Sequence, residues 1–213
     1  MIKIYTDGSC RRTGIGGYGY IVVEDDNILA RFVRREKDTT NQRMELKALI
    51  EAYRYCKNNN IIDGEIHSDS AYCLNCAFEK WYINWEKNNF ISSKGNKVKN
   101  QDLWIELIPF FKESAIKLVK VKGHSTNFYN NVIDSLVTTI SNSATEDLFN
   151  RKFGKLTVLG LYGNKFTEGI NSTFWLCECE CGRTKVVSHA NLHSGGVTSC
   201  GICLSERYED LTG

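Results

Sequence analysis

The chain opens with MIKIYTDGSC at residues 1–10, a stretch in which Ile2 and Ile4 alternate with more polar side chains. This two-residue period predicts a β-strand with one buried face. Asp7 falls where that strand should still be half-buried, and a carboxylate there is costly unless a cation or hydrogen-bond donors meet it. Asp7 followed by Gly8 also fits a tight turn, so this stretch alone leaves a turn and a charged site both open.

The patterns that follow come in an order typical of an α/β domain. Strand patterns come first, a helix with an apolar stripe follows, and later strands alternate with helices, which predicts a mixed sheet with helices packed against it. Pro109 lies inside one helical segment and predicts a kink or a break there. The expected strands are residues 3–7, 17–26, 28–36, 61–69 and 116–124, and the expected helices are residues 39–59, 70–78, 103–112 and 130–140.

The overall composition is that of a globular protein without a strong bias toward one kind of partner. The 213 residues are 42% hydrophobic and carry a net charge of +2, so nucleic-acid binding would have to come from local clusters of charge. No basic and apolar leader precedes Asp7, and no run is long enough to span a membrane. We expect a cytoplasmic protein that is a monomer and has no membrane partner.

Four carboxylates share an unusual setting, because each lies in an apolar local context. Asp7 and Asp69 end expected strands. Glu45 lies on the apolar stripe of the helix at 39–59, and Asp134 opens the last helix. Singly, each fits a turn or a helix cap, but together they would repel one another and stay ionised only around a strongly positive ion. Carboxylate oxygens suit Mg²⁺ or Mn²⁺, and paired ions of this kind clamp the attacking and leaving oxygens of a phosphodiester.

Five blocks of the sequence resemble, in order, those of type I ribonuclease H: YTDGS (5–9), TTNQRMELKALIEA (39–52), IHSDSAY (66–72), VKGHS (121–125) and NNVIDSLV (130–137). The resemblance implies a mixed five-stranded sheet with flanking helices. It also implies cleavage of the RNA strand of RNA–DNA hybrids with two Mg²⁺ ions. It implies that His124 moves protons or helps the product leave. The metal ligands that it implies are Asp7, Glu45, Asp69 and Asp134, with Asp7 as the central one.

The same resemblance marks residues that would contact the hybrid. Short polar side chains beside the metals would recognise 2′-hydroxyls, and Gly8 would let the backbone approach the substrate closely. Residues 80–99 hold five lysines against one acid, and they resemble the family's basic protrusion, which holds the phosphates of the DNA strand. The alternative for this segment is a solvated helix and loop whose tryptophans belong to the core. The expected contacts are Gly8, Ser9, Cys10, Asn41, Gln42, Arg43, Ser70, Trp81, Trp85, Lys87, Lys97 and Lys99.

Five of the nine cysteines lie between Cys177 and Cys203. Without a secretion signal this clustering favours a metal site over disulfides, and a segment of this size needs such support to fold. The knuckles WLCECECG (175–182) and TSCGIC (198–203) predict a Zn²⁺ site. The expected ligands are Cys179, Cys181, Cys200 and Cys203, with Cys177 as a competitor in the first knuckle.

The cysteine-rich segment also resembles, over residues 151–204, a small phage-type zinc-ribbon-like domain found beside DNA-acting modules. That resemblance implies that the segment binds additional nucleic acid. A purely structural or protein-binding module is the alternative. We expect a catalytic domain at residues 1–143, a linker at 144–152 and a small β-rich zinc-binding domain at 153–213.

The sequence therefore predicts an endoribonuclease that leaves 5′-phosphate and 3′-hydroxyl ends by two-metal-ion hydrolysis. Two alternatives stay open. One is a nuclease of the same fold that acts on DNA, and the other is a non-catalytic nucleic-acid-binding protein.

Overall fold

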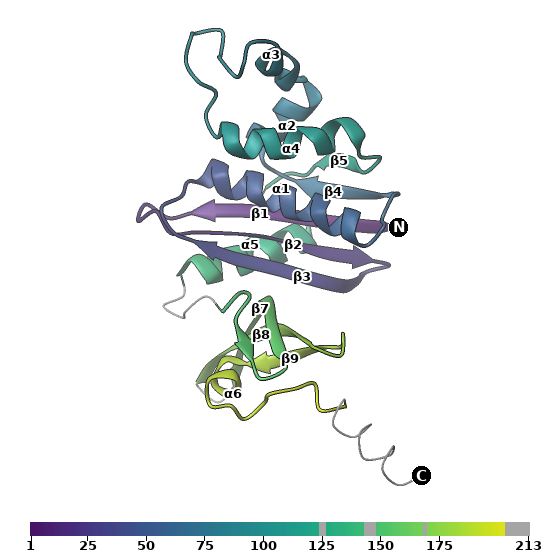
Figure 1. Ribbon diagram of the computed structural model, residues 1–213, viewed down its shortest axis with the longest axis vertical. Helices are drawn as coiled ribbons and strands as arrows, with labels where there is room; N and C mark the ends of the chain where they lie inside the picture. Colours follow the sequence, from purple (N-terminus) through teal and green to yellow (C-terminus); the bar gives the residue numbers. More distant parts are fainter. Residues whose placement is uncertain (124–126, 143–147, 168–169, 203–213) are drawn as a thin grey trace. The chain divides into compact units, whose positions relative to one another are not determined.

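The structure is a computed structural model that describes residues 1–123, 127–142, 148–167 and 170–202 (Figure 1). The chain divides into two compact units. The first comprises Met1–Arg31 and Arg35–Ser143, and the second comprises Phe32–Arg34 and Ala144–Gly213. None of the helices in the described ranges combines the length and the hydropathy that a membrane span needs.

The first unit is built on a five-stranded sheet in the order β3-β2-β1-β4-β5. Strand β1 pairs antiparallel with β2 and parallel with β4, and β4 pairs parallel with β5. The predicted mixed five-stranded sheet is thereby confirmed. The strands are β1 (Ile2–Cys10), β2 (Gly16–Glu24), β3 (Asn27–Glu36), β4 (Gly64–Ser68) and β5 (Lys117–Lys120).

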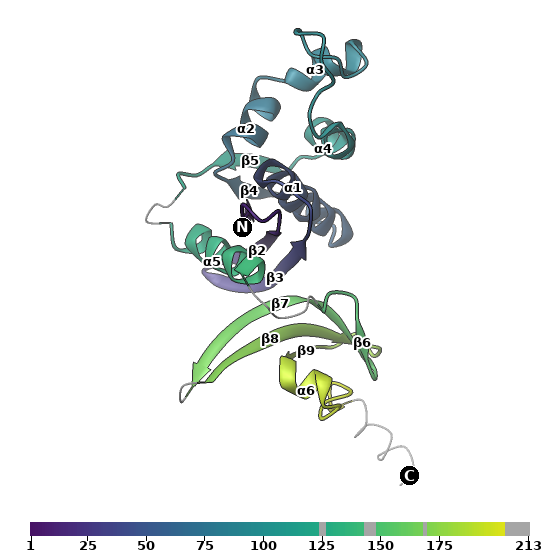
Figure 2. The same ribbon diagram turned by 90° about the vertical axis from the view of Figure 1, so that its left-hand side faces the viewer.

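Helices flank this sheet, and Figure 2 shows α1 and α5 on opposite sides of it. Helix α1 begins after Thr40, whose side-chain oxygen accepts a hydrogen bond of 3.3 Å from the Arg43 N–H. Its apolar stripe, which includes Met44, Ala48 and Leu49, is fully buried, as the helical spacing predicts. The helices of this unit are α1 (Asn41–Asn58), α2 (Ala71–Phe78), α3 (Trp81–Lys87), α4 (Gln101–Glu113) and α5 (Phe128–Asn142).

The prediction that β1 ends at Asp7 was wrong. The strand continues to Cys10, because Asp7 lies opposite Gly19 in the antiparallel pairing with β2. Only the parallel pairing with β4 stops earlier, at Tyr5. Asp7 therefore lies on a rigid strand, at the point where one of its two neighbouring strands has already ended.

The prediction that Asp134 opens a helix was also wrong, and of the kink or break predicted at Pro109 the break was wrong. Asp134 lies in the middle of α5 and not at its start, because the helix already begins at Phe128. Its first turn, Phe128 to Asn131, holds two aromatic residues and two asparagines, and so short a stretch shows no helical period from which the start could be recognised. Pro109 does not break α4, which runs through it to Glu113. The adjacent Ile108 is buried, and packing of this kind outweighs the one backbone hydrogen bond that a proline removes.

The second unit contains a four-stranded sheet in the order β6-β7-β8-β9 and one short helix. Trp175 on β8 is fully buried and pairs with Leu161 on one side and Val187 on the other. This small apolar centre lies on one face of the sheet. The elements are β6 (Lys152–Phe153), β7 (Leu156–Thr167), β8 (Ile170–Cys179), β9 (Thr184–Ser188) and α6 (His189–His193).

Candidate active site

Strand register brings two of the predicted carboxylates to the same edge of the sheet. Tyr5 of β1 pairs with His67 of β4, and Asp7 and Asp69 each follow two residues later. Because the strands are parallel and side chains alternate along a strand, both carboxylates emerge at the carboxyl ends of the strand pair and on the same face.

Glu45 reaches the same place because α1 lies very close to β1. A Cβ atom on Gly8 would lie 2.3 Å from the backbone N of Glu45 and 2.3 Å from the carbonyl carbon of Met44. Atoms do not approach this closely, so only glycine permits this packing. In this structure the close approach at Gly8 is to helix α1, while the approach of substrate to Gly8 stays a prediction.

These side chains converge on one cavity. Carboxylate oxygens of Asp7, Glu45 and Asp69 lie within 4.8 Å of one another. Asp134 comes from α5 and lines, together with these three residues, a cavity of about 210 Å³, which we call the acid cavity. Its other lining residues are Gly8, Ser9, Asn41 and Asn130.

Burial and crowding oppose ionisation in the acid cavity. Asp7 is only 8% exposed, and burial, followed by repulsion from Asp69 and Asp134, raises its pKa to about 7, although the Gly8 N–H acts in the opposite direction. Burial, followed by repulsion from Asp7 and Asp69, also raises the pKa of Glu45 well above its usual range. Without a counter-ion the cluster therefore holds protons that isolated carboxyl groups would have lost.

Within the described part of the chain, two carboxylate oxygens of the acid cavity have no hydrogen-bond partner. They are the buried Asp7 Oδ2 and Glu45 Oε2, and leaving such an atom without a partner costs about 1–3 kcal/mol or more. A divalent cation would satisfy both atoms and offset the repulsion between the carboxylates. The oxygen-only ligand set fits Mg²⁺ or Mn²⁺.

Sequence reasoning missed Asn130, which is 2% exposed and lines the acid cavity. Its side-chain Nδ2 lies 3.5 Å from Asp69 Oδ2. The available signal was its position four residues before Asp134, because residues at that spacing lie on the same face of a helix.

A groove of about 710 Å³ adjoins the acid cavity through Asn41, which lines both. The side chain of Asn41 accepts a hydrogen bond of 2.5 Å from the backbone N–H of Cys10. Three cationic residues line the groove: Arg11, Arg12 and Lys99. Of these, only Lys99 was predicted from the sequence to contact the hybrid. The lining residues are Cys10, Arg11, Arg12, Thr39, Thr40, Asn41, Gln42, Lys99 and Asn100.

Two residues that were predicted to contact the hybrid, Arg43 and Ser70, form hydrogen bonds within the protein. Arg43 forms a bidentate ion pair with Asp102 at the start of α4, with nitrogen–oxygen distances of 2.9 and 2.7 Å. This pair ties the beginning of α1 to the start of α4, just beyond residues 80–99, which we call the basic segment. Ser70 is buried, and its backbone N–H donates to Ser68 Oγ at 3.2 Å. Neither residue lines the acid cavity or the groove.

The basic segment combines half-buried aromatic rings with exposed lysines. Trp85 packs between Trp81 and Trp104, with ring-centroid distances of 6.2 and 5.3 Å. Lys87 and Lys97 are exposed, as is Lys99. The packing of the tryptophans and the exposure of the lysines are both compatible with the predicted phosphate contacts.

The cysteines of the second unit form a second candidate metal group. Sγ atoms of Cys179, Cys181 and Cys200 lie within 4.8 Å of one another. Cys177 is not in this group, and its buried Sγ lies 3.8 Å from the Trp175 carbonyl oxygen. Cys203 lies outside the described residues, as does His124 of the first unit.

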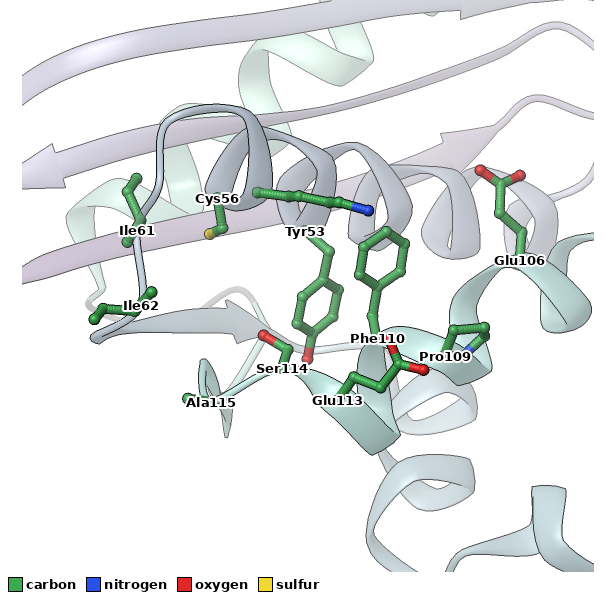
Figure 3. Close-up of a pocket in the computed structure, with 11 residues that line it drawn as sticks. Tyr53, Cys56, Ile61, Ile62, Glu106, Pro109, Phe110, Glu113, Ser114 and Ala115 are labelled. Carbon is green, nitrogen blue, oxygen red and sulfur yellow. The ribbon is translucent and has the colours of Figure 1, made fainter.

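A further cavity of the first unit, of about 470 Å³, shares no residue with the acid cavity (Figure 3). It lies between the end of α1 and α4, where the Tyr53 and Phe110 rings stack at 5.2 Å. Its walls are mainly apolar, with Ile61, Ile62 and Pro109 among them. The groups of metal-binding side chains found among the described residues lie elsewhere.

Comparison with known proteins gives a consistent result for the first unit. A family model described as RNase H matches residues 1–142. The ribonuclease H of Clostridium botulinum (strain Hall) is 42% identical over 139 residues, which cover 63% of this chain and 91% of that protein. The ribonuclease H of Caldanaerobacter subterraneus subsp. tengcongensis is also 42% identical over 139 residues, covering 65% of this chain and 89% of that protein.

Two solved structures are also similar to this chain. LC9-RNase H1, described as a type 1 RNase H with the type 2 active-site motif, has a TM-score of 0.57 and 26% identity, covering 68% of this chain and 73% of that chain. The foamy viral protease-reverse transcriptase in complex with dsDNA also has a TM-score of 0.57 and 26% identity, covering 66% of this chain and 94% of that chain.

Proposed function

This chain belongs to the ribonuclease H family, and we propose that its acid cavity is where the RNA strand of an RNA–DNA hybrid is hydrolysed. The protein is an endoribonuclease that acts on RNA–DNA hybrids. The observation that supports the acid cavity as the site is the convergence of Asp7, Glu45 and Asp69, whose carboxylate oxygens lie within 4.8 Å of one another.

In this proposal the acid cavity holds two Mg²⁺ ions, or Mn²⁺ in their place. Bound there, the ions supply Lewis acidity for an attacking water and for the leaving 3′-oxygen. Asp7 would be the central ligand, because its buried Oδ2 has no hydrogen-bond partner among the described residues and its carboxylate is repelled by both Asp69 and Asp134. Glu45, Asp69 and Asp134 complete the ligand set, and His124 carries protons. The products have 5′-phosphate and 3′-hydroxyl ends.

The groove and the basic segment are the proposed binding surface for the hybrid. Ser9 and Asn41 line the acid cavity, where short polar groups meet the 2′-hydroxyls that distinguish RNA from DNA. Arg11 and Arg12 extend the positive charge of the groove toward Lys99, and phosphates provide most of the affinity of such surfaces. Arg43 acts here through Asp102, by holding the basic segment beside the groove.

The test of this function is strand-specific cleavage and the chemistry of the product ends. Hybrids labelled in either the RNA or the DNA strand are incubated with the protein and Mg²⁺. We expect internal cuts in the RNA strand only, and fragments that a ligase joins without prior phosphorylation. Cuts in the DNA strand would instead support the DNA-acting alternative. Tight binding of an uncut hybrid would support the non-catalytic alternative.

For the second unit we propose a structural Zn²⁺ site. Cys179, Cys181 and Cys200 supply three thiolates, and Cys203 is the proposed fourth ligand. The proximity of the three described Sγ atoms supports this assignment. Cys177 is assigned to the apolar core, because its Sγ lies apart from the group and it is fully buried. A closed site of four thiolates is typical of structural zinc.

Replacing Cys200 is expected to remove zinc, and replacing Cys177 is not. Structural zinc in small domains contributes about 10–16 kcal/mol of apparent binding free energy, so its loss should unfold the second unit. The measurement is the zinc content of purified Cys200→Ser, with Cys177→Ser as the matched control. Equal zinc content in Cys200→Ser and the wild type would contradict the assignment, as would zinc loss confined to Cys177→Ser.

We also propose that the zinc-bound second unit binds additional nucleic acid. Arg151, Lys152 and Arg183 are exposed there, and Lys152 lies 3.8 Å from Glu180. Exposed cations favour phosphate binding. The same Cys200→Ser protein should then bind duplex DNA more weakly than the wild type. Unchanged DNA affinity in the zinc-free protein would leave the second unit as a structural module.

A further inference from the structure

Asn130 is a buried amide whose hydrogen-bonding groups are only partly used among the described residues. Its side chain is on α5, is 2% exposed and lines the acid cavity. Its Oδ1 is buried and has no hydrogen-bond partner among the residues that the structure describes. A buried acceptor in this state costs about 1–3 kcal/mol, so packing alone does not explain an amide at this position.

The amide nitrogen of Asn130 faces a proposed metal ligand. Nδ2 lies 3.5 Å from Asp69 Oδ2, which is long for a hydrogen bond. Hydrogen bonds in catalytic sites are often long before substrate and ions are bound. An ionised carboxylate only accepts hydrogen bonds, so the nitrogen of the amide is the atom that faces Asp69, and Oδ1 is left for another group in the acid cavity.

The backbone places Asn130 in the same cavity as two of the acids, Asp69 and Asp134. It lies one turn before Asp134 on α5, and both residues line the acid cavity. At the start of α5 the backbone N–H of Asn130 donates a hydrogen bond of 3.1 Å to Asn127 Oδ1. The side chain is therefore not needed to begin the helix.

We propose that Asn130 is a positioning residue of the active site, which holds Asp69 through Nδ2 and presents Oδ1 as a neutral acceptor to water in the acid cavity. This inference rests on the proposed function of the acid cavity. A neutral amide supplies an oxygen without adding a fifth negative charge to the carboxylates. Groups that orient metal ligands in this way typically change metal affinity or activity by about 10–100-fold when removed.

The first test replaces Asn130 by Leu, which keeps the shape and removes both polar atoms, beside Asn131→Leu, an exposed neighbour on the same helix. Mn²⁺ affinity is measured by calorimetry without substrate, and hybrid cleavage is measured with and without saturating Mg²⁺. For Asn130→Leu we expect Mn²⁺ affinity and kcat about 10–100-fold lower, with KM for the hybrid unchanged. The metal-free Tm should stay the same or rise, because an unsatisfied polar atom has been removed.

The second test is Asn130→Asp, which keeps the oxygen acceptor and removes the Nδ2 donor. We expect Mn²⁺ binding at least as tight as in the wild type, but slower cleavage than in the wild type because Asp69 is no longer held. Wild-type Mn²⁺ affinity and kcat in Asn130→Leu would overturn the inference. A lower metal-free Tm with unchanged metal affinity would also overturn it, in favour of a merely structural role. Failure of the wild type to cleave hybrids would instead reject the proposed function, while the metal-affinity comparison would still decide the role of Asn130.

Discussion

Replacing Asp7 by Asn is expected to reduce Mg²⁺-dependent cleavage of an RNA–DNA hybrid by at least about 10³-fold, equivalent to about 4 kcal/mol of transition-state stabilisation. The substitution keeps the shape of the side chain and removes a carboxylate that lies close to the other acids of the cavity. An amide does not replace a carboxylate that bridges divalent ions. The measurement is the initial rate of cleavage under saturating Mg²⁺.

The matched control for this prediction is Asp63→Asn, which removes a carboxylate from an exposed position of the first unit. It should cleave at the wild-type rate. The melting temperature of both variants shows whether they are folded. A folded Asp7→Asn protein that retained more than about a tenth of the wild-type rate would contradict the central role of Asp7.

Without divalent metal, the folded protein is expected to lose stability as the pH rises from about 4 to about 7. The pKa of Asp7 is raised from 3.8 to about 7 in the folded state, so the folded protein binds this proton more tightly than the unfolded chain does. Within this window the folded state therefore carries more protons, and its free energy of unfolding falls with pH by an amount on the order of 4 kcal/mol. Glu45 acts in the same direction.

The measurement is calorimetric unfolding of the wild type and of Asp7→Asn in the presence of chelator. The difference between the two free energies of unfolding isolates the contribution of Asp7, because the other titrating groups contribute to both proteins. The Asn variant should be the more stable protein at pH 8 in chelator, and the difference should shrink at pH 4. Excess Mg²⁺ at pH 8 should stabilise the wild type more than the variant. A wild type that is as stable as Asp7→Asn at pH 8 in chelator would argue against burial of an uncompensated carboxylate.

Much of the fold of the first unit could be predicted because its signals are local. The alternation of Ile2 and Ile4 predicted β1, and the spacing of Met44, Ala48 and Leu49 predicted the buried face of α1. The boundaries were harder, because they depend on partners distant in sequence. Strand β1 extends past Asp7 only because β2 pairs with that part of it.

The candidate site could be predicted only in part, for a related reason. The four acids stand out in the sequence because charged residues in apolar surroundings are rare. Asn130 did not stand out, because asparagine is common at helix starts and only the fold shows that its amide is buried against Asp69. The pairing of Arg43 with Asp102, 59 residues away, was likewise not readable from either position.

The most direct test of the account is the rate at which the wild-type protein with Mg²⁺ cleaves three duplexes of the same sequence: an RNA–DNA hybrid, double-stranded RNA and double-stranded DNA. The account predicts Mg²⁺-dependent cleavage of the RNA strand of the hybrid and loss of that cleavage in chelator, with both control duplexes intact. Cleavage of either control duplex at a rate comparable to that of the hybrid, or hybrid cleavage that persists in chelator, would contradict it.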